Sequence, residues 1–290
     1  MAGIIDLIGN TPMAEIKKLN PNPNVRIFAK LEGNNPGGSV KDRPAKNMIQ
    51  SALERGDIKP GRKLIEATSG NTGIALAMIA CLFDLEIELV MPSNSTRERT
   101  LTMEAYGAKV TLLENIEVCR DYAEEKGAKE GYFILNQFAN PDNYLAHYKT
   151  TGPEIWRDTE GRITHFVSAM GTTGTIMGNS RFFKEKDPLI QIIGCQPTEG
   201  SSIPGIRRWP EAYLPKIFEP SRVDRVIDVT EAEATIMARN LAKFEGIFAG
   251  MSSGGAMAGA LKLAEELTEG TIVFICCDRG DRYLSSGLFV

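Results

Sequence analysis

The sequence predicts an α/β protein made of two lobes, each a doubly wound, mostly parallel sheet. Short β-like apolar runs alternate with helical patterns along the whole chain, which is typical of βαβ units. Three of these runs, 163–170, 189–197 and 271–277, are almost continuously apolar, as expected for parallel strands that helices cover on both faces. The density of such short units suggests two lobes, with a ligand beyond the carboxyl ends of the strands.

The first half of the chain shows the alternation clearly. Residues 25–32 are typical of a strand, and apolar residues at helical spacing follow from Ala45 to Leu53, where Gly56 ends the pattern as a C-cap would. Next we expect a helix at 72–83, a polar helical segment before 132, and further strands at 63–67, 86–91, 109–113 and 132–136.

In the second half, Thr230 and Glu233 form a capping box for a helix that runs to about Glu245. The segment 140–154 has two prolines and a cluster of Asn and Asp residues, and it is the best candidate for a boundary between lobes. We therefore expect an N-terminal lobe at 1–145, from which residues of about 13–34 cross to the other lobe, and a C-terminal lobe at 146–290.

Composition excludes several classes of function. The chain has 290 residues, of which 42% are hydrophobic, and a net charge of −4, so it offers no basic face for nucleic acid. No apolar run reaches the roughly 18 residues of a membrane helix. Five scattered cysteines, two histidines and no C-x-x-C argue for reduced thiols in the cytoplasm and against a metal site.

Four polar loops follow predicted strands. TSGNTG (68–73) and GTTGT (171–175) each combine glycines with hydroxyl side chains before a helix, a composition that suits a carboxylate or a phosphate but also an ordinary N-cap and turn. GMSSGGA (250–256) and CCDRGDRYLS (276–285) have equally plain alternatives, a capped turn and a surface ion-pair patch.

A fifth loop, NNPGGSVKDR (34–43), places a proline and two glycines before Lys41. The lysine could be an ordinary solvated side chain at the start of a helix. However, a ligand with one phosphate for GTTGT and a carbonyl for Lys41 satisfies all of these loops, and pyridoxal phosphate meets that description.

These motifs resemble one family. GNNPGGSVKDR, EATSGNTG, GTTGT and G-x-SSG, together with IGNTP at 8–12, are similar in order and over essentially the whole chain to the fold-type II pyridoxal-phosphate enzymes, specifically the cysteine synthases or O-acetylserine sulfhydrylases. TEGSSIPGIRRW (198–209) and CDRGDRYLS (277–285) resemble the B isozyme. The resemblance implies the tryptophan synthase β-like fold, with the active site in the cleft between the lobes.

The resemblance also implies a role for each matched residue. Lys41 would bond the cofactor and then act as acid and base at the α-carbon of the substrate. Asn71 would bond the 3′ oxygen of the cofactor, and Ser252 would face its pyridine nitrogen. Its phosphate would be held by Gly171, Thr172, Thr173, Gly174 and Thr175. The substrate side would be formed by Thr68, Ser69, Asn71, Thr72 and Gln137, with Arg207 and Cys277 near the second substrate.

Two of these roles keep a plain alternative. Arg207 and its neighbour Arg208 could be a solvated surface pair, and we favour recognition of an anionic sulfur donor, or of a partner's C-terminus, for Arg207. Gln137 could merely cap local backbone.

A neutral serine at the ring nitrogen would weaken the ring as an electron sink, which suits β-elimination.

The implied reaction is β-replacement in cysteine biosynthesis. O-acetyl-L-serine or O-phosphoserine would react through an aminoacrylate with sulfide or thiosulfate, giving L-cysteine or S-sulfocysteine, in a cytoplasmic homodimer. Two other readings stay open: a cystathionine β-synthase or serine/threonine dehydratase on the same fold, and a non-catalytic nucleotide- or partner-binding α/β protein. Product analysis separates the first, and the presence of bound cofactor separates the second.

Overall fold

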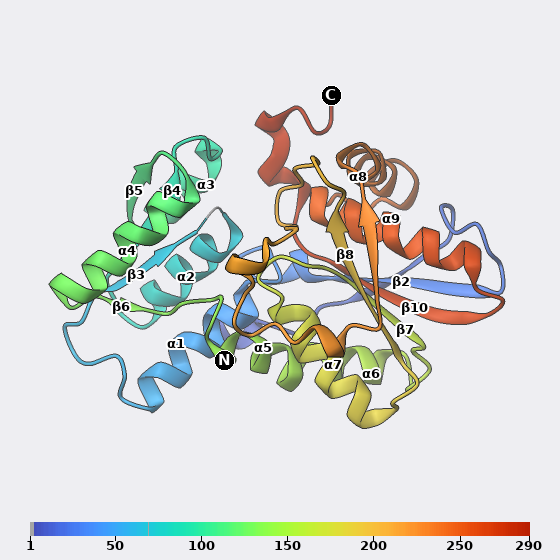
Figure 1. The fold of residues 1–290 in the computed structure, drawn as a ribbon, viewed down its shortest axis with the longest axis horizontal. Coiled ribbons are helices and arrows are strands. Elements are labelled where there is room, and N and C mark those ends of the chain that lie inside the picture. Colours follow the sequence, from blue (N-terminus) through green and yellow to red (C-terminus); the bar gives the residue numbers. More distant parts are fainter. Residues whose placement is uncertain (1–2, 69) are drawn as a thin grey trace.

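The computed structural model, which describes residues 3–68 and 70–290, contains two sheets (Figure 1). The larger sheet has the order β1-β2-β10-β7-β8-β9, and the smaller one β5-β4-β3-β6. The strands of the larger sheet are β1 (Met13–Ile16), β2 (Val25–Leu31), β7 (His165–Ala169), β8 (Gln191–Pro197), β9 (Arg225–Val229) and β10 (Gly270–Cys276). Those of the smaller sheet are β3 (Leu64–Ala67), β4 (Ile87–Pro92), β5 (Lys109–Leu113) and β6 (Phe133–Ile134).

Nearly all strand pairs are parallel, which confirms the predicted fold class. Among the described residues, the one antiparallel pair is β1 with β2. β10 lies between β2 and β7, where Phe274 pairs with Ala29 on one side and Val167 on the other. Residues 13–31, from the first part of the chain, therefore complete the sheet of the second part.

Helices cover both faces of each sheet. They are α1 (Asp42–Glu54), α2 (Asn71–Leu82), α3 (Arg97–Ala105), α4 (Ile116–Glu130), α5 (Pro141–Ala146), α6 (Gly152–Asp158), α7 (Gly174–Lys186), α8 (Glu231–Glu245) and α9 (Met251–Glu266). Figure 1 shows α8 and α9 on one side of the larger sheet and α5, α6 and α7 on the other. In the smaller sheet, α4 packs on the strands opposite α1 and α2.

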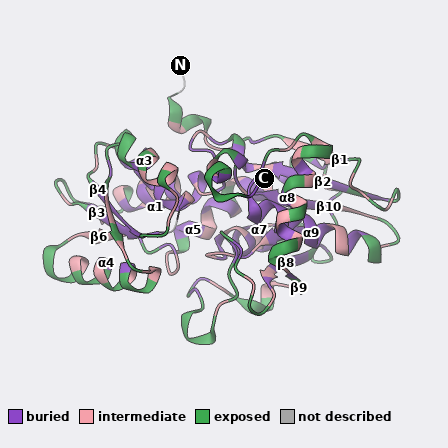
Figure 2. Cartoon of the chain, turned by 90° about the horizontal axis from the view of Figure 1, so that it is seen from above, coloured by how far each residue is buried: buried purple, intermediate pink, exposed green. Residues whose placement is uncertain are grey.

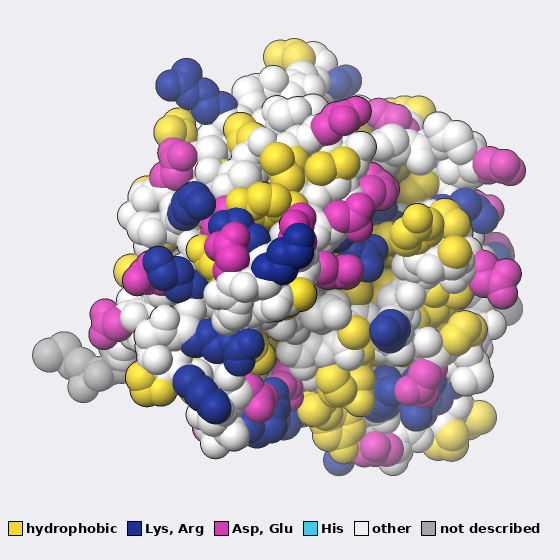
Figure 3. Space-filling model, turned by 60° about the vertical axis from the view of Figure 1, so that its left-hand side comes forward, with side chains coloured by type: hydrophobic (Ala, Val, Ile, Leu, Met, Phe, Trp, Pro, Cys, Tyr) yellow, Lys and Arg dark blue, Asp and Glu magenta, His cyan; other side chains and the backbone are white. Residues whose placement is uncertain are grey.

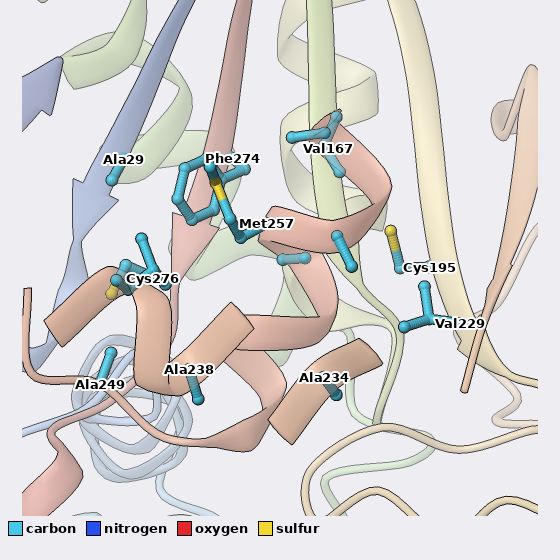
Figure 4. Close-up of a cluster of buried hydrophobic side chains, with 14 of the residues drawn as sticks. Ala29, Val167, Cys195, Val229, Ala234, Ala238, Ala249, Met257, Phe274 and Cys276 are labelled. Carbon is cyan, nitrogen blue, oxygen red and sulfur yellow. The ribbon is translucent and has the colours of Figure 1, made fainter. Parts of the chain in front are cut away.

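Four hydrophobic cores correspond to the four sheet faces. The largest lies between the larger sheet and α8 and α9, where Met257 points toward Phe274 (Figure 4). Figure 2 shows buried residues concentrated in the strands and in the inner helices, with exposed residues along α4 and α8. α2 is buried on all sides from Thr72 to Ala80, which explains why its sequence is apolar without a polar stripe.

Several predicted elements are confirmed. The capping box at Thr230 and Glu233 is present and starts α8, which ends at Glu245 with Gly246 in the left-handed conformation. The predicted strands at 25–32, 63–67 and 109–113 match β2, β3 and β5 to within a residue or so.

The prediction of a loop at 250–256 is wrong, because α9 already begins at Met251. Its glycines serve close packing of helices instead of a turn. A Cβ on Gly254 would lie 2.0 Å from the carbonyl oxygen of Ala234 in α8. Ser252 therefore projects from the first turn of a buried helix, which holds its hydroxyl more rigidly than a loop would.

The segment 140–154 is helical, although its composition suggested a boundary. Asn140 caps α5 by accepting a hydrogen bond from the Asp142 amide, and Pro141 occupies the first turn. A π-helical turn, His147–Thr151, then joins α5 to α6. The division into lobes at 145/146 stays a prediction.

The surface carries mixed charge, and no membrane segment was found. On the face in Figure 3, Lys and Arg side chains alternate with Asp and Glu side chains. Within residues 3–68 and 70–290, no helix has both the length and the apolar character needed to cross a membrane.

Candidate active site

Lys41 occupies the N-cap position of α1, at the end of a tightly held loop. The Gly37 amide donates to Asp42 Oδ2 at 2.5 Å, and the Val40 amide donates to the Cys277 carbonyl at 2.8 Å. A Cβ on Gly37 would lie 2.6 Å from the Asp42 carboxylate. The loop is thus fixed both to its own helix and to the carboxyl end of β10, and Lys41 lies where the two meet.

A buried ion network fixes the start of α1. Arg43 donates to both oxygens of Glu32 at 2.7 and 2.8 Å, and to both oxygens of Glu154 at 2.7 Å. Lys30, also fully buried, lies 2.9 Å from Glu154. Although burial opposes it, bonds from Arg43 and Lys30 hold the pKa of Glu154 at about 2. The helix that carries Lys41 is therefore joined to β2 and α6 by charges that cannot separate without a large cost.

The IGNTP motif at 8–12 donates hydrogen bonds to this network. Thr11 Oγ1 donates to Glu32 at 2.6 Å, and the Asn10 amide donates to Glu154 at 2.9 Å. The Gly9 amide donates to Asn35 in the lysine loop at 2.9 Å. The motif, which only the family resemblance pointed out in the sequence, thus stabilises the loop that carries Lys41.

The GTTGT loop forms the N-terminus of α7. Thr173 has a left-handed backbone, with φ of 68°, and no side chain caps the helix. The Thr173 hydroxyl is buried without a hydrogen-bond partner among the described residues. Because the first N–H groups of a helix lack intrahelical acceptors, the loop presents donors and a positive dipole end to an anion. This arrangement fits a phosphate.

Two neighbouring side chains from α5 and the π-helical turn support the same loop. Asn143 Nδ2 donates to Thr172 Oγ1 at 3.3 Å, and its amide oxygen lies so close to Gly174 that a Cβ there would be 2.0 Å away. His147 bonds Thr175 Oγ1 through Nε2, at 3.3 Å. Burial lowers the pKa of His147 to about 3, with the nearby charges of Arg43 and Lys41 acting in the same direction. His147 is therefore neutral beside the phosphate loop.

The TSGNTG loop connects β3 to α2. Thr68 Oγ1 accepts hydrogen bonds from the Gly70 and Gly73 amides at 3.3 and 3.2 Å. Thr72 Oγ1 donates to Gln137 Oε1 at 2.8 Å. The structure thus brings Thr68, Thr72 and Gln137 together. Ser69, predicted to bind the substrate carboxylate, lies outside the described residues.

Asn71 is held by residues that the sequence did not single out. Its Nδ2 donates to Asp278 Oδ2 at 2.7 Å, and its Oδ1 accepts from Arg282 at 2.5 Å. Tyr283 donates to the same Asp278 oxygen at 2.7 Å, and Arg282 also donates to the Gly37 carbonyl. These contacts connect the C-terminal segment with both the Asn71 loop and the lysine loop.

The plain alternative for the DRGDR run, a surface ion-pair patch, holds for only half of it. Arg279 and Asp281 are exposed and pair with each other at 2.8 Å. Asp278 is 1% exposed, and Arg282 is half-buried against Asn71. Nothing in the local sequence distinguishes Asp278 and Arg282 from Arg279 and Asp281, because the difference in burial arises from where β10 ends relative to α2.

Ser252, in the first turn of α9, and Cys277, directly after β10, lie near Lys41. Burial raises the pKa of the Cys277 thiol to about 11, and the positive charge of Lys41 and a hydrogen bond from Ser252 act against that rise. A Cβ on Gly205 would lie 3.2 Å from Ser252 Cβ. The lysine, the serine and the cysteine therefore share one region at the carboxyl end of β10.

The segment 198–209 covers the phosphate loop. The Arg207 amide donates to the Met170 carbonyl at 2.8 Å, and Trp209 Nε1 donates to the Gly171 carbonyl at 2.7 Å. The Arg207 side chain is exposed and lines a pocket of about 230 Å³ within this segment. The Arg207 backbone is thus fixed beside GTTGT, and its side chain is exposed.

Most of the predicted site residues converge at the carboxyl ends of the parallel strands. Three features form a set that fits pyridoxal phosphate: a lysine at one helix start, a serine in a rigid first turn, and a helix N-terminus whose buried Thr173 hydroxyl has no partner among the residues that the structure describes. The residues suited to hold it are Lys41, Asn71, Gly171, Thr172, Thr173, Gly174, Thr175 and Ser252.

Comparison with known proteins agrees with this geometry. A family model described as pyridoxal-phosphate dependent enzyme matches residues 4–278. Cysteine synthase B of Pseudomonas aeruginosa is 57% identical over 99% of this chain and 97% of its own length. Cysteine synthase A of Escherichia coli is 42% identical, with coverages of 97% and 93%.

The solved structures give the same picture. A cysteine synthase from Entamoeba histolytica superposes with a TM-score of 0.94 at 38% identity, covering 100% of this chain and 90% of that one. An O-ureido-L-serine synthase superposes with a TM-score of 0.94 at 36% identity, with coverages of 100% and 95%.

Proposed function

Because the chain belongs to the pyridoxal-phosphate dependent enzymes, and among them to the cysteine synthases, we propose that it makes L-cysteine from O-acetyl-L-serine and sulfide. The observation that carries the proposal is the placement of Lys41 at the start of α1, beside Ser252 and Cys277. The uncapped N-terminus of α7, with the unpartnered Thr173 hydroxyl, supplies the phosphate site.

The residues of this chain divide the chemistry among them. When bound, pyridoxal phosphate supplies an electron sink for the α-carbon of the amino acid. Lys41 Nζ takes the α-proton as the acetate leaves the β-carbon. After sulfide adds to the β-carbon, Lys41 returns a proton to the α-carbon. Lys41 thus acts as the base in the first half of the reaction and as the acid in the second, so the same amine removes and returns the proton at the α-carbon.

The TSGNTG loop orients the substrate. Its backbone amides at the N-terminus of α2 favour a carboxylate, and the bond between Thr72 and Gln137 fixes the loop relative to β6. We propose that Thr68, Ser69, Asn71, Thr72 and Gln137 form the substrate side.

We extend the proposal to an anionic sulfur donor, thiosulfate, which would give S-sulfocysteine and would be recognised by Arg207. In the described part of the chain, the Arg207 side chain has no hydrogen-bond or ion-pair partner, whereas Arg208 is held by Asp228 at 2.6 Å and by the Pro197 carbonyl at 2.8 Å. An Arg207→Ala variant should lose thiosulfate use more than sulfide use, with Arg208→Ala as the matched control. Equal loss of both donors would reject the role of Arg207.

The finer parts of the function are proposals of the same kind. O-phosphoserine is a second candidate for the first substrate, and we propose a cytoplasmic homodimer as the working form. Sedimentation of the purified protein tests the dimer, and a monomer at micromolar concentration would reject it.

Borohydride trapping and product analysis test the main proposal. The purified protein should be yellow, should lose its colour on reduction, and should carry the label on the Lys41 peptide. With O-acetylserine and sulfide it should form cysteine, and it should not dehydrate serine or threonine. Dehydration of serine without use of O-acetylserine would favour the dehydratase hypothesis. A colourless protein that cannot be reconstituted with pyridoxal phosphate would reject both enzyme hypotheses.

A further inference from the structure

Arg282 touches two loops of the candidate site at once. It lies in the 3-10 helix Gly280–Ser286, beyond the end of β10. Its Nη1 donates to Asn71 Oδ1 at 2.5 Å, and its Nη2 donates to the Gly37 carbonyl. Gly37 lies four residues before Lys41, so one side chain joins the loop of the lysine to the start of α2.

The contacts of Asn71 fix which end of its amide is the nitrogen. Arg282 can only donate, so the amide oxygen of Asn71 must face Arg282, and the amide nitrogen then faces Asp278. Asp278 is itself held, because Tyr283 donates to the same carboxylate oxygen at 2.7 Å. The amide nitrogen has two hydrogens and Asp278 takes one, which leaves one donor with a set direction.

Both polar backbone groups of Gly37 are hydrogen-bonded. Its amide donates to Asp42, and its carbonyl accepts from Arg282. A side chain at this position would displace the Asp42 carboxylate, since a Cβ would lie 2.6 Å from it. The loop before Lys41 therefore has little freedom as long as both partners are present.

We propose that Arg282 is a positioning residue that, with Asp278, presets the Asn71 amide and couples it to the lysine loop. The inference rests on the proposed function for its catalytic consequence, but the coupling itself is a property of the folded chain. Arg279, three residues earlier, pairs with exposed Asp281 instead, and within the described residues its side chain donates a hydrogen bond neither to Asn71 nor to the Gly37 carbonyl. It is a matched control in the same segment.

Hydrogen exchange on the cofactor-free protein tests the coupling without reference to activity. In Arg282→Ala, the amides of 35–40 and of 70–74 should both exchange about tenfold faster, the factor expected when one hydrogen bond is lost. Arg279→Ala should leave both segments at the wild-type rate. If Arg282→Ala exchanges like Arg279→Ala, or if only one of the two segments responds, the coupling role is wrong.

Catalysis and chemical rescue give the second readout. In the holoenzyme, Arg282→Ala should lower kcat by about ten- to a hundredfold, with a weaker affinity for pyridoxal phosphate and a smaller change in KM. A pocket of about 320 Å³ borders Gly37 and Arg282, so added guanidinium ion should restore part of kcat in Arg282→Ala and none in Arg279→Ala. Unchanged kcat, or equal effects of guanidinium on both variants, would overturn the positioning role.

A second variant guards against misfolding. If Arg282→Ala lacks the wild-type circular dichroism spectrum, Arg282→Lys replaces it, because an ammonium lacks the planar fork that reaches two acceptors. This variant should accelerate exchange in both segments by a smaller factor, and wild-type exchange in either segment would contradict the proposal. Absence of cysteine formation by the wild-type protein would instead reject the proposed function, leaving the exchange result to judge the coupling.

Discussion

Replacing Arg43 with methionine should destabilise the protein far more than a typical substitution, because the side chain neutralises two buried carboxylates. Glu32 is 0% exposed and Glu154 is 6% exposed. Arg43 bonds both oxygens of each carboxylate at 2.7–2.8 Å. Methionine has a similar length and no charge, so the change removes the interaction with little loss of volume.

The magnitude follows from which charges lose their partners. Glu154 keeps Lys30 at 2.9 Å and the Asn10 amide at 2.9 Å, so it remains compensated. Glu32 keeps only neutral hydrogen-bond donors, Thr11 at 2.6 Å and Asn35 at 2.9 Å. Removing one partner of a buried pair costs about 3–5 kcal/mol, which is a large share of the roughly 5–15 kcal/mol that stabilises a typical native protein.

A double-mutant cycle isolates this cost. Urea unfolding of the cofactor-free protein at pH 7.5 would be compared for Arg43→Met, Glu32→Met and the double variant. Because the double variant has no orphaned charge, it should be more stable than the sum of the single losses predicts, by at least about 2 kcal/mol. Losses that add to within about 0.5 kcal/mol would refute the claim that the pair is coupled.

Three further predictions concern the site. Gly174→Ala should lower the affinity for pyridoxal phosphate by about tenfold or more, because its Cβ would displace Asn143; titration of the cofactor-free protein measures this, and unchanged affinity would contradict it. Burial raises the pKa of the Asp42 carboxyl to about 7, from an ordinary value of 3.8. As the pH rises from 3.8 to 7, the wild-type protein should therefore lose up to a few kcal/mol of stability relative to Asp42→Asn. Urea unfolding at several pH values measures this, and stability curves that run parallel for the two proteins would contradict it. With a pKa of about 11, Cys277 should be ionised to roughly one part in a thousand at pH 8, so iodoacetamide should label exposed Cys81 well before it, as mass spectrometry can show.

The sequence was a good guide wherever a local pattern determined the outcome. The glycine-rich loop before Lys41 and the capping box at Thr230 depend on nearest neighbours, and both lie where the pattern predicts. The same holds for GTTGT, since a loop of glycines and hydroxyls after a strand opens α7.

The sequence was a poor guide wherever packing between distant segments decided the structure. SSGG looked like a loop, yet its glycines are needed because α8 crosses α9 at that point. Asp278 and Asp281 lie in the same charged run, and only their distance from Asn71 makes one buried and the other exposed. The strands β1 and β9 were not predicted, and both lie at the edges of the larger sheet, where they need less apolar sequence.

The position of β10 has a consequence for how the protein is made. It is inserted between β2 and β7, although it is synthesised roughly 240 residues after β2, a separation typical of slow, non-local pairing. While the ribosome is still translating the chain, β2 with β1 can present only an unpaired edge, which is prone to aggregation. The carboxyl end of β10 also carries Cys277 and Asp278, so the cofactor pocket cannot assemble on a nascent chain until this strand has emerged.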